Sequence, residues 1–179
     1  MNAKILALTA LSAAPAFADT LSLDLNNDAV RINYGHEFSR NYNSDFAWIH
    51  VKNLGNTFTG GILLDQKLSD VITAGIGGKA VFQQHDTLPD GTAVAVGANI
   101  RFSPPELKNV SFGGSAFYAP NVLSFGRMKN YREFELRASY SASEQFSAYV
   151  GYRNNRADYD NASSAKLYDG AMIGGEFHF

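Results

Sequence analysis

The last nine residues of the chain, "AMIGGEFHF" (residues 171–179), decide the fold class. Read in steps of two, one set of positions is apolar or lacks a side chain: Ala171, Ile173, Gly175, Phe177 and Phe179. Because successive side chains of a β-strand point to opposite faces, this pattern predicts a strand with one apolar face. Chain ends are normally polar and frayed, so an apolar face that reaches the last residue indicates an apolar medium around this strand.

The beginning of the chain predicts export. Residues 1–18 combine Lys4, an apolar run over residues 5–11 and the small-residue motif Ala16-Phe17-Ala18, which together are typical of a cleaved secretory signal peptide. The apolar run is far shorter than the roughly 20 residues that a spanning helix requires. We therefore expect residues 1–18 to be removed and residues 19–179 to form a single domain.

Composition narrows the class of the mature chain. Without Lys4, the 15 basic residues fall to 14 against 17 acidic ones, so nothing indicates nucleic-acid binding. Cysteine is absent, although an exported protein is free to form disulfides, so stability must come from packing and backbone pairing. Helical periodicity is hard to find after residue 18, and the composition favours an all-β fold.

The same alternation recurs along the chain, most clearly in "TAVAVGANIRFS" (residues 92–103), where Val94 and Val96 begin an apolar face and Asn99 and Arg101 lie on the opposite one. Nine segments after residue 28 alternate, and "TLSLDLNND" (residues 20–28) supplies a tenth before a tight turn. We predict ten strands, with eight as the alternative. The segment 45–53, "DFAWIHVKN", has apolar residues in both phases, so its phase stays open.

Charged residues alternate with small ones on the other face of these strands, and their signs nearly cancel. We expect this face to line a barrel lumen, with the charges paired across it. The inward-facing set also contains Asp24 and Asp65. The predicted lumen charge network consists of Arg31, Glu37, Lys79, Arg101, Glu133, Glu135, Arg137, Arg153 and Glu176.

Aromatic residues gather at the strand ends, at two levels. Short connections such as "SASEQ" (residues 141–145) alternate with longer ones such as "QQHDTLPDG" (83–91) and "NRADYDNASSAKLYD" (155–169), so we expect short periplasmic turns and longer extracellular loops. The expected girdle at the short-turn rim includes Phe38, Phe102, Phe112, Tyr140, Phe146, Phe177 and Phe179. The expected girdle at the long-loop rim consists of Phe58, Phe82, Tyr118, Phe134 and Tyr152.

These patterns favour an antiparallel transmembrane β-barrel over the alternative, a soluble β-sandwich. An unpaired backbone group is costly in hydrocarbon, so a sheet with its apolar face in lipid has to close on itself. A barrel of about ten strands leaves little free bore, because about eight strands already give an interior that side chains fill. Phe179, Phe177 and Ile173 also resemble the C-terminal signal by which the outer-membrane assembly machinery recognises its substrates.

The chain resembles the YfaZ family of Gram-negative outer-membrane proteins over nearly its whole mature length. The similarity is best in "IGGKAVF" (76–82), "AVGANIRFS" (95–103), "AFYAPN" (116–121), "YVGYRNN" (149–155) and "YDGAMIGGEFHF" (168–179). It implies an outer-membrane location and a porin-like role, with no catalytic residues to carry over. The expected partners are outer-membrane lipid and lipopolysaccharide and, during biogenesis, the barrel assembly machinery and periplasmic chaperones. We expect a monomer without a cofactor.

Two other functions remain open alternatives. His85, with Asp86 and Asp90, is the one exposed histidine and carboxylate cluster, and an outer-membrane hydrolase of lipid or peptide would use such residues. No nucleophile or second histidine accompanies it at a recognisable spacing, so a solvated loop is the preferred interpretation. Adhesion through the extracellular loops is the third hypothesis. Asp158, Asp160 and Arg156 are weak candidates for calcium or lipopolysaccharide contacts.

Overall fold

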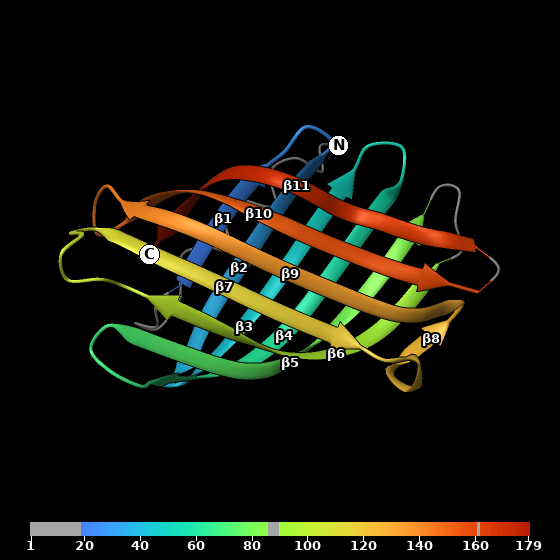
Figure 1. Ribbon diagram of the computed structural model, residues 1–179, viewed down its shortest axis with the longest axis horizontal. Coiled ribbons are helices and arrows are strands. Elements are labelled where there is room, and N and C mark those ends of the chain that lie inside the picture. Colours follow the sequence, from blue (N-terminus) through green and yellow to red (C-terminus); the bar gives the residue numbers. More distant parts are fainter. Residues whose placement is uncertain (1–18, 86–89, 161) are drawn as a thin grey trace, which may run out of the picture.

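The structure, a computed structural model, describes residues 19–85, 90–160 and 162–179 (Figure 1). The predicted signal peptide therefore lies outside the described residues. In the described ranges no helix is long and apolar enough to cross a bilayer. The elements are β1 (Asp19–Leu25), β2 (Ala29–Ser39), β3 (Tyr42–Val51), β4 (Gly55–Lys67), β5 (Ile72–His85), β6 (Gly91–Phe102), β7 (Val110–Ala119), a 3-10 turn η1 (Asn121–Leu123), β8 (Ser124–Gly126), β9 (Met128–Ser141), β10 (Phe146–Tyr159) and β11 (Ala162–His178).

Ten strands close into an antiparallel barrel. Each wall strand pairs with the next along the chain, β7 pairs with β9, and β11 returns to pair with β1. At the closure, the backbone N–H of Asp19 donates to the carbonyl of Phe179 and the N–H of Phe179 donates back, both at 3.0 Å. The three-residue strand β8 pairs only with β6, over Gly91–Ala93, and adds to the wall at one rim. The prediction of ten strands is confirmed, and the eight-strand and sandwich alternatives are wrong.

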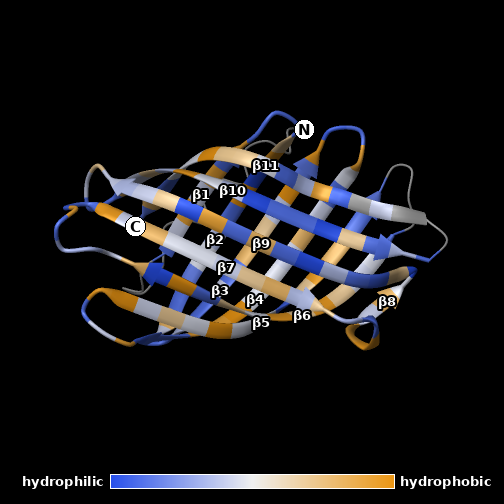
Figure 2. Cartoon of the chain, viewed as in Figure 1, coloured by the Kyte–Doolittle hydropathy of each residue, from blue (hydrophilic) through white to orange (hydrophobic). Residues whose placement is uncertain are grey.

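The outward face is apolar, as the alternation predicts. Ile76 and Ile173 are 65% and 64% exposed on the outer surface. In Figure 2 orange and blue bands succeed each other along the wall strands, as expected of alternating apolar and polar residues. Aromatic residues of neighbouring strands lie in register, because Phe102 is directly opposite Phe112 and Phe58 is opposite Phe82. All ten residues of the predicted girdles that lie between Phe38 and Tyr152 are exposed on this face.

The strand with the ambiguous phase is β3. Its side chains Phe46 and His50 are exposed on the outer face, whereas Ala47 and Ile49 are buried inside. Trp48 lies on the outer face too, where its Nε1–H donates to Asn56 Oδ1 at 3.0 Å. Both phases are apolar because the inner face of this strand contacts an apolar part of the lumen, so the sequence pattern alone did not distinguish them.

The connections at the two rims are similar in length, and the rims differ because some strands extend farther at one of them. We call the rim that contains Asp19 and Phe179 the terminal rim; its connections are 40–41, 68–71, 103–109 and 142–145. The opposite, distal rim has the connections 26–28, 52–54, 86–90, 120–127 and 160–161. The expected long loop at 155–169 is instead strand, because β10 and β11 continue to residues 159 and 162. Their inward residues Ala157, Tyr159 and Leu167 join a buried cluster, which extends the pairing beyond the rest of the barrel.

Candidate functional site

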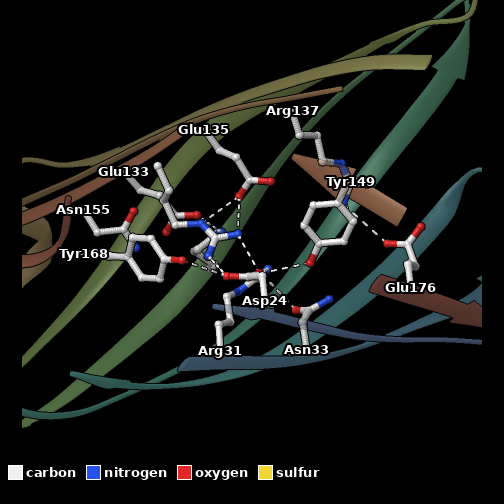
Figure 3. Close-up of polar contacts among 12 residues, drawn as sticks. Asp24, Arg31, Asn33, Glu133, Glu135, Arg137, Tyr149, Asn155, Tyr168 and Glu176 are labelled. Carbon is white, nitrogen blue, oxygen red and sulfur yellow. Dashed lines mark hydrogen bonds and ion pairs between the residues drawn. The ribbon is translucent and has the colours of Figure 1, made fainter. Parts of the chain in front are cut away.

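The lumen is the candidate functional site, and a buried ion cluster occupies its middle (Figure 3). The guanidinium of Arg153, on β10, donates to Asp24 Oδ1 at 2.8 Å and to Glu135 Oε2 at 2.8 Å. Arg153 and Asp24 are 1% and 0% exposed. Arg31 lies 3.5 Å from the same aspartate. One carboxylate on β1 therefore pairs with a cation from the adjacent strand β2 and with a cation from β10, two strands away around the wall.

Two tyrosines also form hydrogen bonds with the carboxylate of Asp24. The hydroxyls of Tyr149 and Tyr168 each donate to its carboxylate at 3.1 Å, from β10 and β11. Both side chains point toward Asp24 in Figure 3. A buried charge is costly unless it is paired and hydrogen-bonded, and Asp24 has both kinds of partner.

A second buried pair joins β5 to β9, the strand that also carries Glu135. Lys79 Nζ, from β5, is 3.0 Å from Glu133 Oε1 of β9, and both side chains are less than a tenth exposed. The Tyr131 hydroxyl donates to the other carboxylate oxygen at 2.5 Å. The ammonium also lies 4.0 Å from the ring centroid of Phe117, a cation–π contact. Arg137 and Glu176 form a looser pair of β9 and β11 at 3.4 Å.

Seven of the nine predicted network residues form ion pairs in the structure. Glu37 and Arg101 face the lumen but form no ion pair among the described residues. Asp24, which the sequence placed on the inward face without assigning it to the network, is its centre. Its local signals are the alternation of "LSLDL" (residues 21–25) and Arg31, which is directly opposite it on β2; its other partners lie far away in sequence.

Apolar clusters fill the lumen on the distal side of the ions. One consists of the buried residues Val81, Ala93, Ala95, Phe117, Ala119, Met128, Tyr131, Ala157, Tyr159 and Leu167. The other consists of Ala29, Ile49, Tyr149, Tyr168 and Met172. Because these inward side chains are buried instead of lining a passage, the described residues leave no open bore through the distal half.

The terminal half of the lumen is hollow and polar. A cavity of about 450 Å³ lies there, with Arg101, Glu37, Asp45, Asp65 and His178 among its lining residues. One carboxylate oxygen of Asp45 and one of Asp65 are buried without a hydrogen-bond partner in the described chain. A polar cavity of this size takes up water. The lumen is thus a vestibule that begins at the terminal rim and ends at the ion cluster.

His85, the histidine of the hydrolase hypothesis, contacts neighbouring residues through both ring nitrogens. His85 Nδ1 lies 3.1 Å from the Leu54 carbonyl, and Nε2 lies 2.7 Å from the Tyr159 hydroxyl. Asp90 accepts from the His85 backbone N–H at 3.1 Å, while Asp86 lies outside the described residues. Across the described ranges, no three metal-ligating side chains gather into a possible ion site.

The residues of the predicted assembly signal lie on the outer face at the C-terminus, two of them in β11 and Phe179 directly after it. Ile173, Phe177 and Phe179 are all exposed, and the rings of the two phenylalanines stack with their centroids 5.9 Å apart. Phe177 is in register with Phe146 on β10 and with Leu21 on β1. The C-terminal residues therefore contribute to the belt at the terminal rim and to the closure of the barrel.

The chain is similar to one protein family and to several solved outer-membrane structures. The family model described as "YfaZ precursor" matches residues 1–179. No curated protein matches the chain. The NanC porin structure is similar at a TM-score of 0.50 and 9% identity, covering 92% of this chain and 100% of that one. The outer membrane channel DcaP of Acinetobacter baumannii gives a TM-score of 0.49 at 11% identity, covering 88% of this chain, which spans 54% of that channel. Omp33 of the same organism gives 0.35 at 12% identity, with coverages of 91% and 96%.

Proposed function

The chain belongs to the YfaZ family, and from this membership and its filled lumen we propose that it is a non-enzymatic outer-membrane barrel whose transport path is closed by its own side chains. It has the architecture of a small porin without an open bore. The observation that carries the proposal is the layer formed by Asp24, Arg153 and Tyr131, each at most 1% exposed, between the terminal vestibule and the distal rim.

The proposal includes the cellular location. Residues 1–18 direct export and are removed, the outward apolar face lies in the outer membrane, and the terminal rim with its vestibule faces the periplasm. Outer-membrane lipid and lipopolysaccharide surround the wall. The barrel assembly machinery and periplasmic chaperones insert the chain, which acts as a monomer. The closed strand pairing between β1 and β11 supports the membrane location, because a sheet in hydrocarbon has no free edge.

Conductance in planar bilayers tests the closed lumen. We expect the purified wild-type protein to show no large stable channels, and Tyr131→Ala to produce channels by removing a fully buried ring from the apolar cluster. Tyr140→Ala is the matched control, since this tyrosine of the same strand is 53% exposed on the outer face. Wild-type channels that pass sugar-sized solutes would overturn the proposal.

A further inference from the structure

Three cations stand side by side on the outer surface of the barrel, close to the distal rim. Arg132 on β9 is directly opposite Arg156 on β10, and Arg156 is directly opposite Lys166 on β11. Their side chains point outward, because the alternate residues Tyr131 and Glu133 are buried inside. Lys166 is 63% exposed and Arg156 33%. We call these three residues the cationic row.

The cationic row is poorly compensated within the protein. Like charges directly opposite each other destabilise a sheet. Asp169 accepts from Arg156 and Lys166, each at 3.3 Å, so one carboxylate serves two of the three cations. Arg132 forms no ion pair or hydrogen bond through its side chain in the part of the chain that the structure describes. Arg156 Nε is buried without a partner there.

Neighbouring carboxylates do not supply the missing charge. Asp160 pairs with Lys129 at 2.7 Å, beyond the cationic row. Asp158 lies opposite Asn130, one outward position beyond the row, and makes no ion pair among the described residues. An external anion is therefore the partner that the arrangement lacks.

The position of the cationic row matches the headgroup layer of a membrane. Phe134 and Tyr152 of the distal girdle lie midway along the 14-residue strands β9 and β10, so both strands continue beyond the apolar surface. Arg132 is the next outward residue after Phe134, about 7 Å farther along the strand at about 3.3 Å per residue. It is also in register with the girdle residue Tyr118. Cations that border an aromatic belt lie at the depth of lipid phosphates.

We propose that the cationic row binds the phosphates of lipid A, the anchor of lipopolysaccharide, in the outer leaflet. Arginine is suited to this role because its planar guanidinium donates two parallel hydrogen bonds to phosphate. The bound phosphate offsets the repulsion between Arg132 and Arg156 and accepts hydrogen bonds from the guanidinium of Arg132. The proposal rests on the outer-membrane location given above, and it assigns a lipid contact to one side of the barrel, over β9–β11.

Thermal unfolding of the purified mature protein in detergent micelles tests the cationic row. The micelles contain phosphorylated lipid A, dephosphorylated lipid A or no added lipid. We expect only phosphorylated lipid A to raise the Tm of the wild type. Arg132→Gln should leave the Tm unchanged or higher without lipid, because it removes a like charge. It should require about tenfold more phosphorylated lipid A for half of the rise, the effect of losing one charge-assisted contact.

A second row variant, a control variant and inorganic phosphate complete the test of the cationic row. Lys166→Gln, at the β11 end of the cationic row, should weaken the response in the same way. Lys67→Gln is the control, since this lysine lies at the terminal rim, 3.2 Å from Asp70, and should respond as the wild type does. Equal responses to both lipid A forms, or a normal response of both row variants, would refute the proposal. So would an equal rise with inorganic phosphate alone.

This assay does not depend on the location or conductance of the protein. Cell fractionation tests the outer-membrane location separately. A protein recovered from the inner membrane whose Tm still rises with phosphorylated lipid A would contradict the proposed function and leave the phosphate site in place. An outer-membrane protein whose Tm does not distinguish the two lipids would contradict the phosphate site and leave the proposed function in place.

Discussion

At the scale of single residues, the charges of the lumen differ in burial and pairing. Arg153 bridges Asp24 and Glu135 at 2.8 Å each and is almost fully buried. Arg101 lines the water-accessible vestibule and has no ion-pair partner among the described residues. Removing one member of a buried ion pair leaves the other charge uncompensated, whereas removing a solvated charge leaves nothing stranded.

The residue-scale prediction compares these two arginines. Arg153→Met should lower the free energy of unfolding by about 3–5 kcal/mol, because Asp24 and Glu135 lose their shared cation. Arg101→Met should change it by no more than about 0.5 kcal/mol. Urea unfolding followed by the fluorescence of the single tryptophan, Trp48, measures both. Equal destabilisation by the two substitutions would show that the ion cluster does not determine lumen stability.

At the scale of elements, β11 has two roles. Its hydrogen bonds with β1 close the sheet. Its outward side chains Ile173 and Phe177, with Phe179 directly after the strand, continue the apolar belt. The backbone of Phe179 makes two of the closing hydrogen bonds, both with Asp19 at 3.0 Å. A change at the last residue therefore affects the closure of the barrel as well as its lipid-facing surface.

The element-scale prediction concerns this residue. Deletion of Phe179 removes two closing hydrogen bonds and an aromatic ring, whose burial in lipid contributes about 1.5–3 kcal/mol. We expect the deleted form to accumulate in the periplasm as protease-sensitive protein. Phe179→Tyr keeps the backbone pairing and the ring and should assemble. Heat-modifiable electrophoretic mobility distinguishes assembled from unassembled barrel, and normal assembly of the deleted form would contradict the role of this residue.

At the scale of the whole molecule, the barrel has two unlike halves. The terminal half is a polar vestibule of about 450 Å³, and the distal half is packed with apolar side chains. The strands β9–β11 continue past the girdle at the distal rim. We expect a barrel built in this way to admit water from the terminal rim and not from the distal rim.

The whole-molecule prediction follows from this asymmetry, and the absence of native cysteine allows it to be tested with single thiols. A membrane-impermeant thiol reagent should label Arg101→Cys only when the periplasm is made accessible. It should label Lys129→Cys, which is 52% exposed beyond the cationic row, on intact cells. Ala95→Cys, inside the distal cluster, should stay unlabelled in both conditions. Labelling of Arg101→Cys on intact cells would show an open or inverted barrel.

The sequence alone determined the all-β fold, the ten strands and the orientation of most side chains. A wall between lipid and lumen imposes a period of two on every strand, and that period is local enough to be found in segments such as 92–103. The tight turn at 26–28 was predictable because it too depends on local contacts. The Asn26 side chain accepts from the Asp28 and Ala29 N–H groups within the turn.

Only the tertiary structure decided which inward charges meet and how far the lumen is filled. Asp24 and Arg153 are 129 positions apart, and their contact depends on the stagger of the strands around the barrel, which no local pattern encodes. Apolar residues inside the distal half made β3 apolar on both faces and concealed its phase. The same apolar interior kept residues such as Tyr159 and Leu167 in paired strands where polar composition had predicted a loop. Contacts across the lumen override local composition because burial of these side chains is a property of the closed barrel.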